Sequence, residues 1–402
     1  MSAVYIHIPF CKHRCYYCDF ITYANINDML PDYLEALQTE IMSASFNVGE
    51  AETVYIGGGT PSLMSSEQVD VILQTVQKRF GIADGAEITM EVNPGTVKDG
   101  YYAQLKAVGV NRLSMGVQSF VDEELRVIGR IHNAEEAKLS FLSAREAEFE
   151  NISLDLIFGL PGQTMTSWRK SLKAIEALKP DHLSIYSLIL EPGTPLTKLI
   201  EKGIVQLPDD DLVADMFEET MDYLGRIGYE HYEISSWAID ESRESRHNKV
   251  YWKAKDYLGF GVGAVGCVGG TRWHNTARVE EYILKITSSA RRHGEKQLLK
   301  ASNDSETLGN DRLSIVTEEE FLSMREQMNE MMFLGLRMTR EGVSKFDFRR
   351  RFGLEMANVY EEEIQKLINL GLVEWRGENP TRRLVLTRRG CMLGNQVFME
   401  FV

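Results

Sequence analysis

Short apolar runs alternate with helical stretches along the first half of this chain, and this alternation constrains its fold more than any other feature. The runs have the length and composition of buried strands, and the stretches between them have helical periodicity. Strands separated by helices in this way form parallel β/α units, so the sequence predicts an α/β fold. The expected strands are 4–8, 53–59, 87–94, 112–119, 152–161 and 182–188, with a seventh candidate strand over 229–238. The expected helices are 31–46, 66–80, 97–108, 134–147 and 166–178.

Each expected strand ends in polar or glycine-rich residues. Examples are the cysteine-containing segment, GGGTP, EVNP, GVQS and the stretch from Asp155 to GLPG. In α/β barrels the functional loops gather at the carboxyl ends of the strands. We therefore expect these segments to converge on one mouth.

Cys11, Cys15 and Cys18 have the spacing C-x3-C-x2-C. Three thiolates leave a tetrahedral zinc one ligand short, whereas they suit a [4Fe-4S] cluster with one open iron that can chelate a small molecule. The alternative, three ordinary core or surface cysteines, is disfavoured by the spacing. The chain has only five cysteines, which fits a reducing compartment better than a disulfide-stapled secreted fold.

Polar and glycine residues at the other strand ends are candidate ligand contacts. Glycines let the backbone approach a ligand, carboxylate and amide side chains bind hydroxyl or amino groups, and arginine offers a fork for a carboxylate. Any of them alone would more often be a solvated or capping residue, so their significance depends on the cysteine motif. They are Gly58, Gly59, Thr60, Glu91, Gln118, Arg130 and Asp155.

The C-terminal part has a different organisation. From about residue 317 it becomes helical and then continues as helix, helix and a hairpin over 372–390, an order that resembles a winged helix. A net charge of −15 argues against a general nucleic-acid binder, so a packing or docking module is favoured over DNA binding. The expected domains are a barrel over 1–235, a connecting region with HNKVYW and a glycine loop over 236–312, and a winged-helix-like domain over 313–402.

The N-terminal MSAVYIHI lacks the charged and apolar regions of a signal peptide, and no uninterrupted apolar run of about 18 residues follows. We therefore expect a cytoplasmic protein. Peripheral contact with a membrane stays open.

The motifs YIHIPFCKHRCYYCDF, GGGTP, EVNP, RLSMGVQS, DLIFGLPGQT and HNKVYW together resemble the radical S-adenosylmethionine superfamily. More narrowly, they resemble its oxygen-independent coproporphyrinogen III oxidase-like branch, which contains dehydrogenases and heme chaperones. The resemblance covers nearly the whole chain and implies a partial (β/α)6 barrel and a [4Fe-4S] cluster on the three cysteines. The S-adenosylmethionine contacts that it implies are Tyr5, Tyr17, Gly58, Gly59, Thr60, Glu91, Gln118, Arg130 and Asp155.

Two features favour the chaperones over the dehydrogenases of this branch. The dehydrogenases have a fourth cysteine two residues after the third, where this chain has Phe20. The segment from His247 to Trp252 also fits the HNxxYW motif that is associated with heme in the chaperones. An imidazole can ligate heme iron, and Tyr251 and Trp252 can pack on a porphyrin. Many relatives have a glycine-loop histidine where this chain has Val265, so the candidate ligands are His247, His231 and His274.

The resemblance thus implies a heme chaperone that delivers heme to acceptor hemoproteins such as membrane cytochromes. It also implies a flavodoxin or ferredoxin as electron donor and a homodimer. The first alternative is an oxygen-independent coproporphyrinogen III dehydrogenase, so whether the chain is an enzyme stays open. Further alternatives are a radical methyltransferase, a heme-degrading enzyme, and a transcription regulator that uses the winged module.

Overall fold

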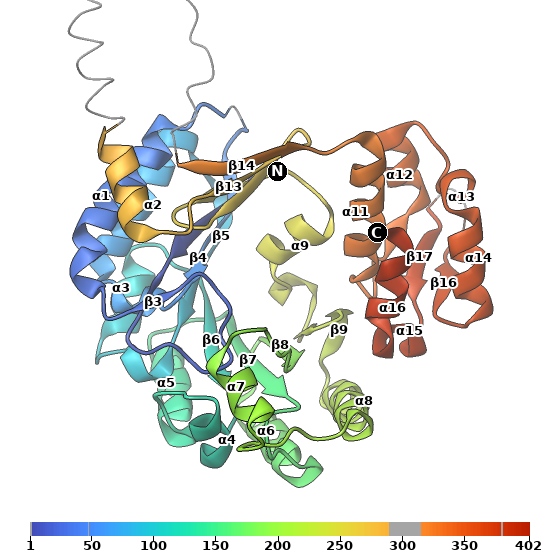
Figure 1. Cartoon of the computed structure of the whole chain (residues 1–402), viewed down its shortest axis with the longest axis horizontal. Helices are drawn as coiled ribbons and strands as arrows, with labels where there is room; N and C mark the ends of the chain where they lie inside the picture. Colours follow the sequence, from blue (N-terminus) through green and yellow to red (C-terminus); the bar gives the residue numbers. More distant parts are fainter. Residues whose placement is uncertain (1, 47, 289–314, 379–380) are drawn as a thin grey trace, which may run out of the picture.

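The chain folds around one large sheet. The computed structural model describes residues 2–46, 48–288, 315–378 and 381–402. Its main sheet has the order β14-β13-β12-β11-β1-β4-β5-β6-β7-β8-β10-β9. Six neighbouring strands are parallel, follow chain order and curve into an open, partial barrel (Figure 1), which confirms the predicted fold class. They are β1 (Ser2–Ile8), β4 (Ala51–Gly58), β5 (Ile82–Val92), β6 (Arg112–Gln118), β7 (Ile152–Phe158) and β8 (His182–Ser187).

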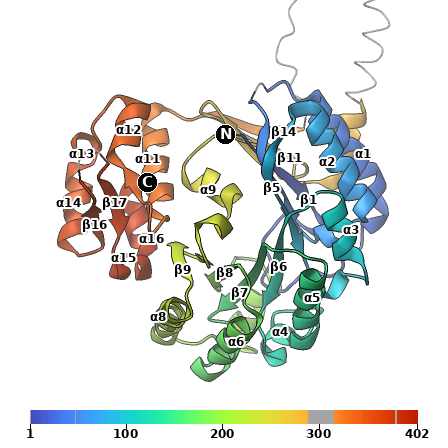
Figure 2. The ribbon, with the colours of Figure 1, turned by 180° about the vertical axis from the view of Figure 1, so that it is seen from behind.

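Helices pack on the outer face of this barrel (Figure 1 and, from behind, Figure 2). Local capping explains where some of them begin. The Ser65 side chain accepts from the backbone N–H of Gln68, whose side chain accepts from the Ser65 backbone, and this capping box starts α2. All five predicted helices are present: α1 (Leu30–Ser43), α2 (Ser66–Phe80), α3 (Tyr101–Ala107), α5 (Ala134–Glu146) and α6 (Met165–Leu178).

Alternation along the strands separates the core from the barrel interior. On β1, Val4, Ile6 and Ile8 are fully buried and belong to the large core cluster beneath the helices. The intervening Tyr5 and His7 point to the other face, because successive side chains of a strand lie on opposite sides. The same rule directs polar side chains of the other parallel strands into the barrel, where the site lies.

One edge of the sheet differs from the prediction of a strand over 229–238. That segment forms two antiparallel strands, β9 (Glu230–Glu233) and β10 (Ser236–Ala238), and β10 pairs with β8. The chain turns between them, where the N–H of Ile234 donates to the carbonyl of Arg337 in the C-terminal part. The single-strand prediction is therefore wrong.

The other edge is formed by a glycine-rich segment. β11 runs parallel to β1, and three antiparallel strands follow. Gly261 and Gly263 have φ of +99° and +65° in the turn after β11, as expected for a turn-forming glycine run. The strands on either side of this turn are not predicted by the apolar pattern. They are β11 (Tyr257–Phe260), β12 (Val265–Val268), β13 (Thr271–Asn275) and β14 (Val316–Phe321).

The C-terminal module has its own core and a three-stranded sheet of order β15-β17-β16, the arrangement expected of a winged-helix-like domain. Its core includes Met332, Phe348 and Tyr360. The predicted domain limits stay a prediction, because residues 289–314 lie outside the described part of the chain. The module's elements are α11 (Met324–Leu336), β15 (Val343–Ser344), α12 (Lys345–Phe352), α13 (Met356–Val359), α14 (Glu361–Asn369), β16 (Val373–Arg376), β17 (Arg383–Leu386), α15 (Arg388–Met392) and α16 (Gly394–Phe398).

Helix α9 (Arg246–Trp252) lies between the barrel and the C-terminal module in both views (Figures 1 and 2). Lys249 on this helix pairs with Glu341 of the module at 2.5 Å, and the guanidinium of Arg337 lies 4.4 Å from the ring centre of Trp252. The helix therefore joins the two parts. Among the described residues, no helix has the length and apolar character needed to cross a membrane.

Candidate functional site at the barrel mouth

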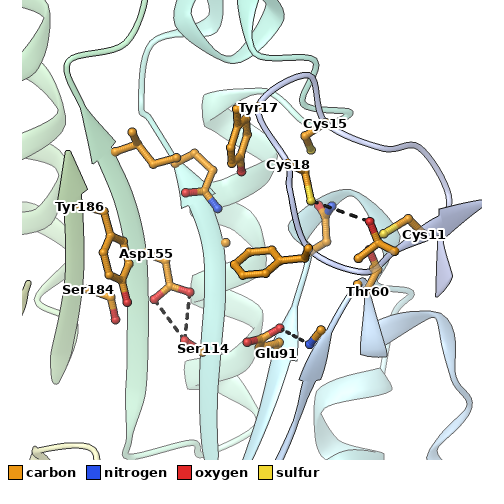
Figure 3. A pocket seen from close by; sticks show the side chains of 18 of the residues that line it. Cys11, Cys15, Tyr17, Cys18, Thr60, Glu91, Ser114, Asp155, Ser184 and Tyr186 are labelled. Atoms are coloured by element: carbon orange, nitrogen blue, oxygen red, sulfur yellow. Dashed lines mark hydrogen bonds between the residues drawn. The ribbon is translucent and has the colours of Figure 1, made fainter. Parts of the chain in front are cut away.

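A cavity of about 480 Å³ opens at the carboxyl ends of the parallel strands. Its wall is formed by the cysteine-containing loop, by the glycine loop after β4, and by residues of β5, β6, β7 and β8. Side chains from these strands, far apart in the sequence, face one space (Figure 3). The predicted convergence is therefore present. All the predicted cluster ligands line the cavity, as do all the predicted S-adenosylmethionine contacts except Tyr5.

The three cysteines lie together on one side of this cavity (Figure 3). Cys11 ends β2 (Phe10–Cys11), and the other two lie in the loop that follows. None of them is in a disulfide. Each sulfur has a polar neighbour: Thr60 Oγ1 lies 3.5 Å from Cys11 Sγ, Arg130 Nη1 lies 3.4 Å from Cys15 Sγ, and Thr22 Oγ1 lies 3.8 Å from Cys18 Sγ.

A [4Fe-4S] cluster fits this arrangement of three thiols. Within the described ranges, no three His, Cys, Asp or Glu side chains are grouped as ligands of one ion. A [4Fe-4S] cluster does not need such convergence, because each thiolate binds a different iron. Burial raises the pKa of the Cys11 thiol, and the hydrogen bond from Thr60 lowers it in part. Iron binding would therefore displace a proton from this sulfur.

The glycine loop lies so close to the cysteine strand that side chains are excluded. Gly58 has φ +114°, and a Cβ there would come within 2.6 Å of the His7 ring. A Cβ on Gly59 would come within 2.7 Å of the carbonyl oxygen of Phe10 and 3.1 Å of Cys11 Sγ. The glycines therefore let the loop pack beside the cluster residues, with its backbone exposed to the cavity.

Glu91 holds the glycine loop from the neighbouring strand. Its Oε2 accepts from the N–H of Gly58 at 2.9 Å, and its Oε1 accepts from the hydroxyl of Tyr55 at 2.9 Å. Burial raises the pKa of Glu91 to about 7, and the hydrogen bond from Tyr55 lowers it in part. A cationic amino group of a ligand beside this carboxyl would hold it ionised.

Gln118 has a strained backbone at the end of β6. It is a non-glycine residue with φ +68°, and the pairing of β6 with β7 shifts register between Gly116 and Gln118. Such bulges and left-handed residues occur next to binding sites, where they re-aim a side chain. Here the residue lines the cavity.

Arg130 has an unused donor at the cavity wall. Its Nη1 donates to Cys15 Sγ and its Nη2 donates to the carbonyl of Gly116. Its buried Nε has no hydrogen-bond partner among the described residues. A ligand carboxylate could take that donor, which supports the predicted role of the arginine fork.

Asp155 is the acceptor of a serine network on the opposite wall (Figure 3). Ser114 Oγ lies 2.9 and 3.1 Å from its two oxygens, and Ser153 Oγ lies 3.2 Å from Oδ1. Burial raises the pKa of Asp155, and the hydrogen bond from Ser114 lowers it in part. The carboxyl keeps lone pairs for hydroxyl groups of a ligand.

Tyr17 and Tyr5 occupy different places. Tyr17 lines the cavity and packs against a small apolar cluster that contains Ile128 and Ile157. Tyr5 lies deeper in the barrel, where its hydroxyl is 2.9 Å from His7 Nδ1 and its ring stacks on Tyr55 at 6.1 Å. It is not part of the cavity wall.

Several residues of the cavity wall were not predicted from the sequence. Residues 112, 114, 116 and 118 are every second residue of β6, and all four line the cavity. Because alternate residues of a strand share a face, counting back in steps of two from Gln118 would have identified the other three. The side chain of Arg112 is buried, and its Nε has no partner in the described part of the chain. The residues missed are Tyr55, Arg112, Ser114, Ser184, Tyr186 and Asn248.

The HNKVYW segment forms α9 at the other end of the barrel. The N–H groups of Arg246 and His247 donate to Glu87, which lies in the middle of β5 and pairs with Thr53 near the start of β4. His247 is 1% exposed; its Nδ1 lies 2.9 Å from Thr53 Oγ1 and its Nε2 lies 2.8 Å from the Tyr251 hydroxyl. Neither ring nitrogen is open to a heme iron in this arrangement.

Only one residue of this motif, Asn248, reaches the cavity wall. Burial lowers the pKa of His247 to about 3, and the nearby Arg112 adds to this effect, so the imidazole is neutral. Trp252 lies beneath the guanidinium of Arg337. The motif therefore closes the floor of the barrel, and heme contact by His247, Tyr251 and Trp252 stays a prediction.

Comparison with known proteins matches these observations to a family. The model of the radical SAM superfamily matches residues 5–175, and the HemN C-terminal domain matches residues 322–393. In solved structures, coproporphyrinogen III oxidase (HemN) from Escherichia coli superposes with a TM-score of 0.79 at 24% identity, over 100% of this chain and 89% of that one. That likeness concerns the fold.

Similarity to curated proteins is high over the full length. Heme chaperone HemW of Bacillus subtilis is 38% identical, and the match covers 100% of this chain and 99% of that protein. Heme chaperone HemW of Lactococcus lactis is 37% identical over 100% of this chain and 97% of that protein. With the cysteine trio, the glycine loop and the C-terminal module in place, the chain belongs to the HemW family of the radical SAM superfamily.

Proposed function

We propose that this chain is a heme chaperone, which binds heme and passes it to acceptor hemoproteins with the help of a [4Fe-4S] cluster and S-adenosylmethionine. The observation that carries the proposal is the position of Phe20. This side chain is 67% exposed and lines the cavity mouth, where dehydrogenases of the same branch have a fourth cysteine. An exposed aromatic ring at a cofactor cavity suits a flat apolar ligand.

The residues of the cavity have distinct roles in this proposal. The three cysteines hold the cluster, which supplies an open iron for the methionine part of S-adenosylmethionine and an electron for radical chemistry. The glycine loop and Thr60 line the cofactor's path, and Arg130 offers its unused donor to the carboxylate. Glu91 accepts from the amino group. Tyr17, Gln118 and Asp155 contact the adenosyl part.

The proposed partners follow from the same function. Acceptors are hemoproteins such as membrane cytochromes, and the electron donor is a flavodoxin or ferredoxin. We expect a cytoplasmic protein that meets its acceptors at the membrane surface, forms a homodimer and does not use nucleic acid as a partner. The net charge of −15 supports the last point.

Heme binding and transfer test the proposal directly. Anaerobically reconstituted protein is titrated with hemin, with and without S-adenosylmethionine, and then mixed with an apo-cytochrome b. The triple variant of Cys11, Cys15 and Cys18 to Ala is compared with the double variant Cys267→Ala/Cys391→Ala, which keeps the trio. We expect transfer by wild type and by the double variant, and its loss in the triple variant.

Two results would count against this function. Wild-type protein that binds no heme under any of these conditions would contradict it. Anaerobic conversion of coproporphyrinogen III to protoporphyrinogen IX would favour the dehydrogenase instead.

A further inference from the structure

The histidines of this chain differ in whether their ring nitrogens are free to bind a ligand or a metal. Seven of the eight lie in the described part. Half-buried His231 stacks on Trp237 at 4.3 Å and bonds the carbonyl of Ile234 through Nε2. Two of the seven, His13 and His274, have no hydrogen bond to a ring nitrogen from any described residue. Four are buried with both ring nitrogens hydrogen-bonded: His7, His132, His182 and His247.

The two available histidines lie in different places. His13 is an exposed residue of the cysteine loop and lines the mouth of the cavity. Its ring meets that of Tyr16 edge-on at 6.0 Å, which leaves both nitrogens open. His274 lies on β13 and is not part of the cavity wall. His13 is therefore the one histidine in the described ranges that combines an accessible ring with a position at the cavity.

Exposed apolar side chains line the same cavity as His13. Phe20 is 67% exposed, Ile189 is 69% exposed and Tyr186 is 43% exposed, and all three line the cavity. Phe20 comes from the cysteine loop, whereas the other two come from the end of β8 and the loop after it. Exposed apolar side chains that meet across a cavity mouth mark a ligand-binding surface.

The mouth also carries cationic groups. Arg14 lines the cavity, and its Nη2 donates to the carbonyls of Cys18 and Phe20. Within the described residues no carboxylate pairs with this guanidinium, so its charge is available to an anion. Asp19 and Glu191 line the mouth as well, so an anionic ligand group at the mouth is favoured beside Arg14 rather than beside these carboxylates.

We propose that His13 is an axial ligand of heme bound at the mouth of the cavity. The porphyrin lies on Phe20 and Ile189, and Arg14 faces a propionate. The step is a ligand substitution: the lone pair of a ring nitrogen of His13 replaces water on the heme iron, and no electron is transferred. The proposal rests on the proposed function, since it names the heme site of the chaperone.

Absorbance spectroscopy of heme complexes tests this assignment. Reconstituted wild type, His13→Gly and His274→Gly are titrated anaerobically with hemin, and the iron and sulfide content of each protein is measured to show that the cluster is retained. We expect His13→Gly to lose the wild-type Soret position and to bind heme at least tenfold more weakly. His274→Gly should match wild type. Added imidazole should restore the wild-type spectrum in His13→Gly alone.

A second variant separates the role of the apolar side chains under the porphyrin from the role of the axial ligand. Phe20→Ser should weaken heme binding while it leaves the Soret position of the bound form unchanged. If wild type binds no heme, the proposed function fails. If wild type binds heme and His13→Gly has the same spectrum and affinity, the function stands and the assignment of His13 is overturned.

Discussion

Arg130 Nη1 lies 3.4 Å from the sulfur of Cys15, so one guanidinium reaches both the cysteine loop and the space beside it. Its Nη2 holds the carbonyl of Gly116 on β6. The cluster loop and the strand that presents Gln118 are thereby fixed relative to each other. The buried Nε has no hydrogen-bond partner among the described residues, which makes it a candidate donor to a ligand carboxylate.

Arg130→Lys should weaken S-adenosylmethionine binding, because lysine keeps the charge but loses the fork. We expect the dissociation constant to rise about tenfold, equivalent to ~1.4 kcal/mol. Anaerobic equilibrium dialysis with S-adenosylmethionine measures it. Arg126→Lys is the control, since Arg126 is exposed and, among the described residues, forms its ion pair with Glu123 on its own helix. Equal affinities in the two variants would contradict the role of Arg130.

Gly58→Ala should lower the free energy of unfolding by more than the ordinary cost of placing an alanine at a positive φ. Gly100→Ala isolates that cost, because Gly100 has φ +74° and open space around its Cβ position. We expect about 1–2 kcal/mol for Gly100→Ala. Gly58→Ala should cost at least about 1 kcal/mol more, since its Cβ meets the His7 ring. Urea unfolding measures both, and equal losses would remove the steric argument.

Glu40 should make stability depend on pH. Burial raises its pKa to about 7 from an ordinary 4.5, although Tyr282, Gly261 and Asn275 donate to the carboxylate. A raised pKa means that the folded state holds the proton more tightly. The contribution of Glu40 is therefore most favourable below pH 4.5 and is lost as pH rises through 7.

Glu40→Gln tests this dependence. The free energy of unfolding of wild type should lose up to about 3 kcal/mol from this group between pH 4.5 and 7. In Glu40→Gln, this part of the change in the free energy of unfolding with pH should be absent. Glu35→Gln, at an exposed position of the same helix, should keep it. A slope unchanged by Glu40→Gln would show that another group is responsible.

His247→Ala should lower the stability of the folded protein and leave heme binding unchanged. It leaves Thr53 and Tyr251 without their partner in a buried place, at a cost of about 2–3 kcal/mol. Thermal unfolding measures the loss. The folded variant should keep the wild-type Soret band with hemin. Loss of that band in folded His247→Ala would instead support the HNxxYW motif as the heme ligand.

Much of the barrel could be predicted because its signals are local. Each parallel strand is a short apolar run that ends at a glycine or polar residue, as at Gly57, and capping residues such as Ser65 fix the starts of helices. The residues that reach the cavity from strand ends were predicted for the same reason. Cys11 and Glu91 lie at or next to the ends of β2 and β5. Asp155, predicted near a strand end, instead lies in the middle of β7 and reaches the cavity from there.

The features that were not predicted depend on contacts between distant segments. β11 is only four residues long and begins a glycine-rich segment, and it becomes a strand because it pairs with β1. Tyr5 lies on the inner face of its strand, but its depth depends on packing against Tyr55. The burial of His247 depends on Thr53, which is 194 residues away in the sequence. No local pattern contains that contact.

One turn of helix α9 contacts both the cavity and the C-terminal module. Asn248 touches the space that a cofactor would fill, and the next residue, Lys249, forms ion pairs with Glu244 and with Glu341 of the C-terminal module. Any displacement of this turn changes both contacts at once. A ligand that contacts Asn248 would therefore lie one residue away from the ion pair that ties this helix to the C-terminal module.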